Sequence, residues 1–253
     1  MSVLSRVRLR FAKQGDLRLV SHHDLMRCLE RLVRRAGLPV AQSKGFNPRP
    51  KIAFALALAL GIEGRREVVD IDLEEPLGAD RVRELLASES PDGLEWFEAQ
   101  DVPIGKAVQI SSVRYELQVP ADRREVAARS VEVLLASDRW PFVRRRPDRD
   151  IEADLRPFVL GAELDPEGTL QIHLKMTPSG SARPEEVLDA LGLRDLLGSG
   201  GVLVRTDMDL APPTESGPTP PAPPKPAPPS AAGEPPPTLI VAGGRAVDAE
   251  NRP

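Results

Sequence analysis

Four arginines near the N-terminus lie at helical spacing, and their side chains suit phosphate. A guanidinium is always charged and presents a planar fork of donors that matches phosphate oxygens. Between the arginines, apolar residues recur at the spacing of one helix face, at Leu25, Leu29, Leu32, Val33 and Ala36. The pattern predicts one helix that begins after Ser21 as N-cap and stops at Gly37. We expect its opposite, solvent-facing side to bind a polyanion through Arg27, Arg31, Arg34 and Arg35.

A loop of unusual composition follows this helix, with the sequence SKGFNPRPK from Ser43 to Lys51. Its two prolines stiffen the chain, and its glycine lets backbone N–H groups approach an oxyanion. The spacing of a Walker A loop is absent. Phe46 has two readings, because it could stack a nucleobase or plug the protein core. The binding residues predicted in this loop are Lys44, Gly45, Phe46, Asn47, Arg49 and Lys51.

Two adjacent histidines stand where the predicted helix begins. Imidazole titrates near neutral pH, so His22 or His23, beside Asp24, could act as an acid–base catalyst on a bound phosphodiester. Neighbouring residues on a helix point in different directions, and a metal would need a further ligand from elsewhere, so no metal site is expected. The remaining reading is that both histidines cap the helix and add donors to the binding surface.

The charge of the chain is unevenly distributed. The net charge is −4, but the first 66 residues hold 14 Lys and Arg against 4 Asp and Glu, a balance of +10. Such asymmetry indicates a polyanion partner for the basic part. Two alternatives remain, because the halves could attract each other or the basic face could simply be solvated.

Hydrophobic patterns in the first hundred residues follow the order strand, helix, strand, strand, helix, strand. Strands are expected over residues 6–11, 52–60, 68–73 and 94–102, with helices over 21–36 and 79–88. This is the ferredoxin-like βαββαβ order. The following residues repeat it, with a helix over 122–137 whose Val126, Val133 and Leu134 face inward. The predicted fold is therefore α+β, with two tandem ferredoxin-like domains at residues 1–108 and 109–210.

The end of the chain has a different composition. Residues 211–253 are rich in proline and are expected to form a disordered, Pro-rich tail. Cys28 is the single cysteine, which excludes an internal disulfide and a cysteine-rich zinc site. No apolar run approaches the length of a membrane span, and the start of the sequence does not resemble a signal peptide. We expect a cytoplasmic protein without a membrane partner.

Two weaker clusters complete the set of candidate sites. Asp70 and Asp72 form a carboxylate pair, but strand alternation predicts that both lie on the exposed face of a hairpin. A second basic cluster contains Arg144, Arg145, Arg146 and Arg149. It could extend the polyanion track, or it could be a solvated strand end, since Asp148 and Asp150 dilute its charge.

Three motifs follow one another along the chain, namely a Ser-His-x-Asp-x-x-Arg helix start, a Gly-Phe-Asn-Pro loop and a small-residue strand ending in Leu-Gly. In this sequence these are Ser21, His22, Asp24 and Arg27, then Gly45 to Pro48, then Leu60 and Gly61. With these motifs, most of the chain resembles an uncharacterised bacterial family linked to cobalamin-binding radical SAM proteins. The segments ADLRPFV (153–159), ARPEEVL (182–188) and VRT (204–206) also resemble it. The resemblance implies a radical SAM partner, plausibly in RNA modification or translation.

These observations lead to an expected function with two alternatives. The chain lacks the CxxxCxxC motif of radical SAM enzymes, so we expect an RNA-binding accessory module that acts beside a separate radical SAM enzyme. The RNA is expected to be tRNA or rRNA, with no preference for DNA and no cofactor held by this chain. One alternative is an RNA-processing or RNA-modifying enzyme that uses His22 or His23. The other is an adaptor whose basic face docks an acidic protein.

Overall fold

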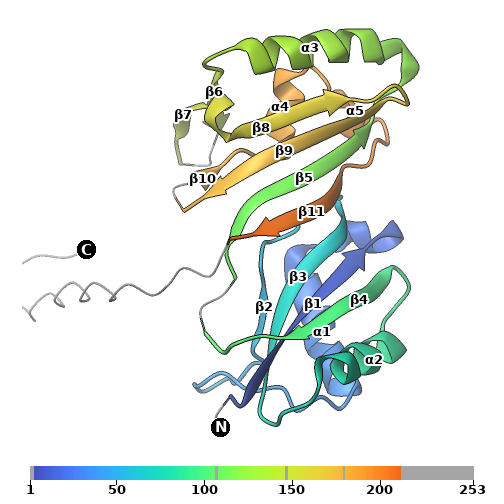
Figure 1. The fold of residues 1–253 in the computed structure, drawn as a ribbon, viewed down its shortest axis with the longest axis vertical. Coiled ribbons are helices and arrows are strands. Elements are labelled where there is room, and N and C mark those ends of the chain that lie inside the picture. The colour runs from blue at the N-terminus through green and yellow to red at the C-terminus, as the bar shows by residue number, and fades with distance from the viewer. Residues whose placement is uncertain (1–2, 106–107, 146–147, 179, 212–253) are drawn as a thin grey trace, which may run out of the picture. The chain divides into compact units, whose positions relative to one another are not determined.

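The structure is a computed structural model, and it describes residues 3–105, 108–145, 148–178 and 180–211. The α+β prediction is confirmed, since helices accompany a large and mostly antiparallel sheet (Figure 1). The predicted Pro-rich tail lies outside the described residues from position 212 onward. No helix in the described ranges combines the length and the apolar character that crossing a membrane requires.

The N-terminal half, residues 3–105, contains four strands and two long helices. Its strand order is β4-β1-β3-β2, and each neighbouring pair is antiparallel. Apolar side chains of both helices pack with the inward-facing side chains of the strands in one buried cluster. The elements are β1 (Ser5–Lys13), α1 (His22–Arg35), β2 (Ile52–Phe54), β3 (Glu63–Leu73), α2 (Ala79–Glu89) and β4 (Leu94–Asp101), with a short 3-10 helix at Gly15–Leu19.

The C-terminal half, residues 108–211, supplies most of a second buried cluster and has an added hairpin. Leu58, Ile62 and Val68 of the N-terminal half also belong to this cluster. Its main strands follow the order β11-β5-β9-β8, again antiparallel, and β6 pairs with β7 in a separate two-stranded sheet. The strands are β5 (Ile110–Gln118), β6 (Pro141–Arg145), β7 (Asp150–Asp154), β8 (Val159–Leu164), β9 (Thr169–Thr177), β10 (Gly180–Ser181) and β11 (Val204–Leu210). The helices are α3 (Arg124–Ala136), α4 (Pro184–Ala190) and α5 (Asp195–Gly198), with 3-10 helices at Ala121–Arg123 and Arg156–Phe158.

The last strand joins the two halves into one sheet. β11 lies parallel to the start of β3, with Val204 opposite Glu63 and Arg205 opposite Gly64. Figure 1 shows β11 beside β3 where the two halves meet. The predicted domain limits at residues 108 and 210, and the tandem ferredoxin-like arrangement, stay predictions.

The strand predicted over residues 52–60 is wrong beyond Phe54. Only Ile52, Ala53 and Phe54 pair with β3, opposite Ile71, Asp70 and Val69. Nearer its start, the same edge of β3 pairs with β11 instead. The carbonyls of Leu56 and Ala57 accept hydrogen bonds from the Arg205 side chain. The Ala55 N–H still donates to the Val68 carbonyl of β3, and beyond it Arg205 replaces a strand partner for the carbonyls of Leu56 and Ala57.

The prediction that Asp70 and Asp72 are exposed is also wrong. The register of β1 against β3 places Arg8 opposite Asp70 and Arg6 opposite Asp72. Each arginine donates two hydrogen bonds to its carboxylate, at 2.7 and 2.9 Å for Asp70. Both aspartates are buried, so these charges stabilise the pairing of the strands rather than forming an acid–base pair.

The inward face predicted for the helix over 122–137 is partly wrong. Leu134 is buried, but Val126 and Val133 are more than half exposed. The buried side chains of α3 are Ala127, Val131 and Leu134, at i, i+4 and i+7. A shift of one residue along an α-helix rotates a side chain by about 100°, so Val126 and Val133 lie on the face next to the buried one.

Candidate nucleic-acid interface

Local hydrogen bonds fix the start of α1. The Ser21 hydroxyl accepts a hydrogen bond from the backbone N–H of Asp24 at 3.2 Å and donates to the Asp24 carboxylate at 2.7 Å. This is the predicted N-cap, which satisfies a donor that the first turn would otherwise leave free. The helix ends before Gly37, whose φ of +63° suits a residue without Cβ. The predicted extent of the helix is confirmed.

The two faces of α1 lie as the sequence predicts. Leu25, Leu29, Leu32 and Val33 are buried in the core of the N-terminal half. Burying four such side chains anchors the helix firmly on the sheet, at about 2 kcal/mol for each. The opposite face is solvent-exposed and carries Arg27, Arg31, Arg34 and Arg35.

The four guanidiniums differ in their partners. Arg27 contacts Asp24 at 3.3 Å within the helix, and Arg35 donates to the backbone carbonyl of Glu89 at 2.7 Å. Within the described ranges, no carboxylate lies within 4.0 Å of Arg31 or Arg34. These two side chains therefore carry uncompensated charge on an exposed helix face, where phosphate oxygens could replace water as acceptors.

Backbone bonds close the base of the loop that follows. The Ser43 N–H donates to the Arg49 carbonyl at 2.8 Å, and the Arg49 N–H donates to the Ser43 hydroxyl at 2.9 Å. Below this pair, the Lys51 N–H donates to the Ala41 carbonyl. Gly45 has a φ of +144°, which a residue with a Cβ adopts rarely. Hydrogen bonds at its base therefore fix the conformation of the loop at residues 43–51, which projects from the fold.

The tip of this loop is directed into solvent. Phe46 is 106% exposed relative to its reference state, so the reading in which it plugs the core is wrong. Its neighbours Lys44, Gly45, Asn47, Pro48 and Arg49 are exposed too. Lys51, at the base of the loop, is half-buried. A large exposed aromatic side chain among cations is a platform on which a nucleobase can stack.

The two histidines diverge at the start of α1. The His22 ring packs edge-on against Phe54 at 5.1 Å, and its buried Nδ1 has no hydrogen-bond partner among the described residues. Burial lowers the pKa of His22, and the positive charges of His23, Arg205 and Lys13 lower it further. His23 is exposed. A neutral His22 facing the interior is poorly placed to reach a phosphodiester, whereas His23 and Asp24 remain on the surface.

The structure also places a buried ion pair that the sequence reading missed. Arg205 on β11 donates to both carboxylate oxygens of Glu67 on β3, and each residue is 2% exposed. Burial alone would lower the pKa of Arg205, but the charge and hydrogen bonds of Glu67 hold it above the ordinary value. Arg205 lies in the VRT segment at residues 204–206, but the two residues stand 138 positions apart, so their pairing could not be inferred from local sequence.

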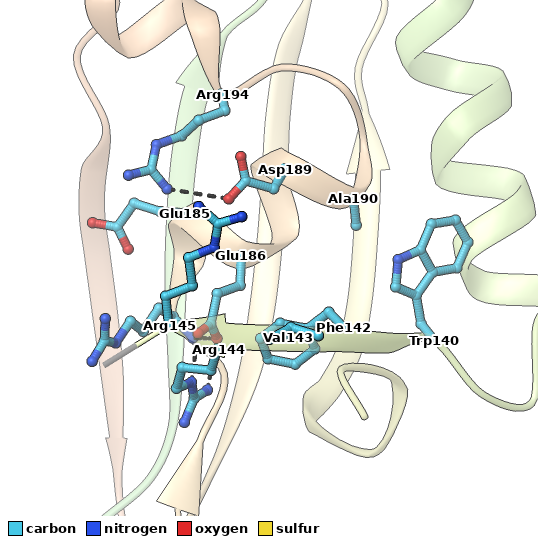
Figure 2. Close-up of a pocket in the computed structure, with 11 residues that line it drawn as sticks. Trp140, Phe142, Val143, Arg144, Arg145, Glu185, Glu186, Asp189, Ala190 and Arg194 are labelled. Carbon is cyan, nitrogen blue, oxygen red and sulfur yellow. Dashed lines mark hydrogen bonds and ion pairs between the residues drawn. The ribbon is translucent and has the colours of Figure 1, made fainter. Parts of the chain in front are cut away.

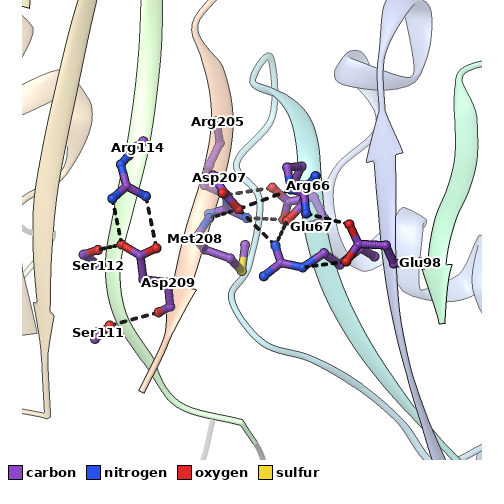
Figure 3. Close-up of polar contacts among 11 residues, drawn as sticks. Arg66, Glu67, Glu98, Ser111, Ser112, Arg114, Arg205, Asp207, Met208 and Asp209 are labelled. Carbon is purple, nitrogen blue, oxygen red and sulfur yellow. Dashed lines mark hydrogen bonds and ion pairs between the residues drawn. The ribbon is translucent and has the colours of Figure 1, made fainter. Parts of the chain in front are cut away.

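Further ion pairs between the two halves neutralise part of the positive charge of residues 1–66. Arg66 contacts Asp207 (Figure 3). Arg10 also contacts Asp207, and Arg65 contacts Glu116. Because these acids belong to the C-terminal half, the attraction between the halves accounts for some of the +10 balance. The arginines of α1 and the cations of the loop at residues 43–51 take no part in those junction pairs.

Comparisons with known proteins identify a family without a described activity. Residues 6–184 match the family described as "Uncharacterized protein conserved in bacteria (DUF2344)". No curated protein matches the sequence.

Two solved structures resemble parts of the fold. One is the crystal structure of a Cbf5-Nop10-Gar1 complex, at 15% identity over 81% of this chain, with a TM-score of 0.37. This chain covers 49% of the length of the matched chain. The other is an unknown protein from Galdieria sulphuraria, at 11% identity over 82% of this chain and 98% of that one, with a TM-score of 0.25. Scores this low support no inference about function.

Proposed function

The chain belongs to the DUF2344 family of uncharacterised bacterial proteins, and we propose that it binds structured RNA through α1 and the loop at residues 43–51. The observation that carries the proposal is the pair Arg31 and Arg34, exposed on α1 with no carboxylate partner among the described residues. Arginine at such a position releases counterions when it contacts phosphate, which favours binding to a polyanion.

The loop at residues 43–51 adds a second kind of contact. Phosphate contacts alone do not distinguish RNA from another polyanion, whereas an exposed aromatic side chain can stack on an unpaired base. Phe46 stands on a braced loop, so little conformational entropy is lost when a base docks on it. Lys44 and Arg49 would contact the flanking phosphates. The preferred RNA is therefore one that offers a helical stem beside unpaired nucleotides, such as tRNA or rRNA.

We further propose that this module presents RNA to a separate radical SAM enzyme. The support is the sequence resemblance at Ser21 to Arg27 and at Gly45 to Pro48. A [4Fe–4S] cluster held by the radical SAM motif needs three cysteines, and this sequence has Cys28 alone. The partner would catalyse the reaction, and this chain would bind the RNA.

We also infer that the two halves are tandem ferredoxin-like domains, with limits near residues 108 and 210. The support is the strand order β4-β1-β3-β2 in the first half and β11-β5-β9-β8 in the second. In both halves the second strand in sequence lies at the edge, beside the third, as the βαββαβ order requires.

An electrophoretic mobility shift with a purified tRNA and the full chain tests the proposed function. At low salt, the expected result is a complex that weakens steeply as salt is added. The absence of any RNA complex at low salt would overturn the proposal. A pull-down from cells, with and without nuclease, separates it from the adaptor alternative, because contacts that survive nuclease treatment are protein contacts.

A further inference from the structure

A pocket on the C-terminal half is separate from the proposed RNA-binding surface. It has a volume of about 540 Å3 and lies between β6 and α4 (Figure 2). Its lining includes Trp140, Phe142 and Arg144 from one side and Glu185 and Glu186 from the other. Protein sites for small molecules commonly have volumes in this range and combine aromatic walls with a few polar groups.

One wall of the pocket is fixed by a bidentate ion pair. Arg144 donates to both carboxylate oxygens of Glu186, at 2.6 and 2.7 Å, and to the Ser181 carbonyl at 3.0 Å. Its guanidinium also lies 5.5 Å from the ring centroid of Phe142. These contacts hold β6 against α4, and they satisfy both charges of the pair. Arg144 and Glu186 therefore shape the pocket without needing a ligand.

Other charges at the pocket lack such partners. Arg145 and Arg183 are exposed, and within the described ranges neither guanidinium forms an ion pair with a carboxylate, although the Arg183 backbone N–H donates to the Glu186 carboxylate at 2.8 Å. Arg194 contacts Asp189 at 3.4 Å, but both side chains are at least half exposed, so this pair is weak. The rim can therefore hold an anion, with Arg145 and Arg183 as charge-assisted donors to a phosphate.

The remaining lining groups suit an aromatic ring with polar substituents. Trp140 is half-buried at the end of the pocket beyond Phe142, as Figure 2 shows. An indole face stacks well on a planar base. Glu185 forms no ion pair with any described residue, and its carboxylate can accept hydrogen bonds from a ribose hydroxyl or a base amino group.

We propose that this pocket binds a single nucleotide, with the base on Trp140 and the phosphate at Arg145 and Arg183. The proposal goes beyond RNA binding by α1, because it uses other residues, on the other half of the chain. It concerns binding alone and requires no bond to form or break.

The two tryptophans of the chain allow a direct test. Trp96 is buried in the core of the N-terminal half and is 7% exposed, so only Trp140 should respond to a ligand in the pocket. Titration of the full chain with adenosine monophosphate should quench tryptophan fluorescence in a saturable way. Trp140→Phe should abolish the quenching. Adenosine alone and inorganic phosphate alone should each bind more weakly than the mononucleotide.

Calorimetric titration of variants locates the site. Arg145→Ala and Arg183→Ala should each weaken mononucleotide binding by about tenfold, which is the usual effect of losing one charge-assisted hydrogen bond. Arg129→Ala, on the exposed face of α3, is the matched control and should change nothing. The double variant Arg31→Ala, Arg34→Ala should also bind normally, so failure of the RNA proposal would not affect this result.

Three outcomes would overturn the nucleotide site. They are the absence of saturable binding at millimolar mononucleotide, equal affinity for inorganic phosphate and mononucleotide, and unchanged affinity in both Arg145→Ala and Arg183→Ala.

Discussion

Arg205 and Glu67 form a buried ion pair that joins the last strand of the described fold to the third. The Arg205 Nε lies 2.8 Å from one Glu67 carboxylate oxygen (Figure 3). The Arg205 side chain also donates to the carbonyls of Leu56 and Ala57. Residues 56 and 57 follow β2, which itself follows the loop at residues 43–51. The C-terminal half thus helps to hold the segment beside the proposed RNA-binding surface.

Breaking this pair should destabilise the protein strongly. Glu67→Gln leaves the Arg205 charge buried without a counterion, and we expect the free energy of unfolding to fall by about 3–5 kcal/mol. Urea unfolding followed by circular dichroism measures the change. Glu125→Gln removes the partner of an exposed pair on α3 and should have almost no effect. Equal stability of Glu67→Gln and Glu125→Gln would contradict the structure.

The N-cap of α1 should have a moderate effect on stability. Ser21→Ala removes the acceptor for the Asp24 N–H, and the expected loss is about 1 kcal/mol. Ser21→Thr keeps a hydroxyl at the same position and should recover most of it. Thermal unfolding of both variants beside the wild type gives the comparison. A Ser21→Thr variant as unstable as Ser21→Ala would show that the cap is not the cause.

Stability should depend on pH through His22. Its pKa in the folded state is lowered below the ordinary value of 6.5, chiefly by burial. Above pH 6.5 the ring is neutral in both states. As the pH falls below 6.5, the unfolded chain takes up the proton first, so the folded state loses stability. The measurement is the free energy of unfolding between about pH 7 and pH 5, a window above the titration of ordinary carboxyl groups.

The variant His22→Gln should reduce this pH dependence. The pKa of His173 is also lowered, mainly by burial, so some dependence should remain and should disappear only in the double variant His22→Gln, His173→Gln. An unchanged slope in His22→Gln would mean that its ring is not buried as described.

Phe46 should contribute to RNA binding and not to folding. The side chain is fully exposed, so Phe46→Ala should leave the thermal midpoint unchanged. If a base stacks on the ring, the free energy of RNA binding should become about 1–3 kcal/mol less favourable. Phe46→Trp is the matched control and should preserve affinity. The readout is fluorescence anisotropy with a labelled RNA hairpin, and equal affinity for Phe46→Ala and wild type would exclude stacking.

Features that rest on local sequence were predicted well. The extent of α1 follows from the cap at Ser21, the stop at Gly37 and the spacing of its leucines, all within 17 residues. Contacts across α1 repeat every turn, so both its apolar face and its cationic face could be read from periodicity alone.

Features that depend on distant partners were not predictable. The segment after Phe54 has an ideal strand pattern, but it does not continue along β3 as a strand. The start of β3, at Glu63 and Gly64, pairs with β11 instead, and the sequence does not reveal that β11 takes this place. Asp70 and Asp72 are buried because the register of β1 brings arginines opposite them. The exposure of Phe46 depends on the bonds between Ser43 and Arg49, which the composition of the loop does not reveal.

The salt dependence of RNA binding tests the central proposal most directly. The double variant Arg31→Ala, Arg34→Ala removes two exposed charges from α1, and Arg81→Ala, Arg129→Ala removes two exposed charges from other helices. Affinity for a tRNA is measured for both and for the wild type over a range of salt concentrations. If Arg31 and Arg34 contact RNA phosphates, the log–log slope should fall by about 1.4–1.8 for the α1 variant and stay unchanged for the control. Equal slopes for the α1 variant and the wild type would contradict the proposal.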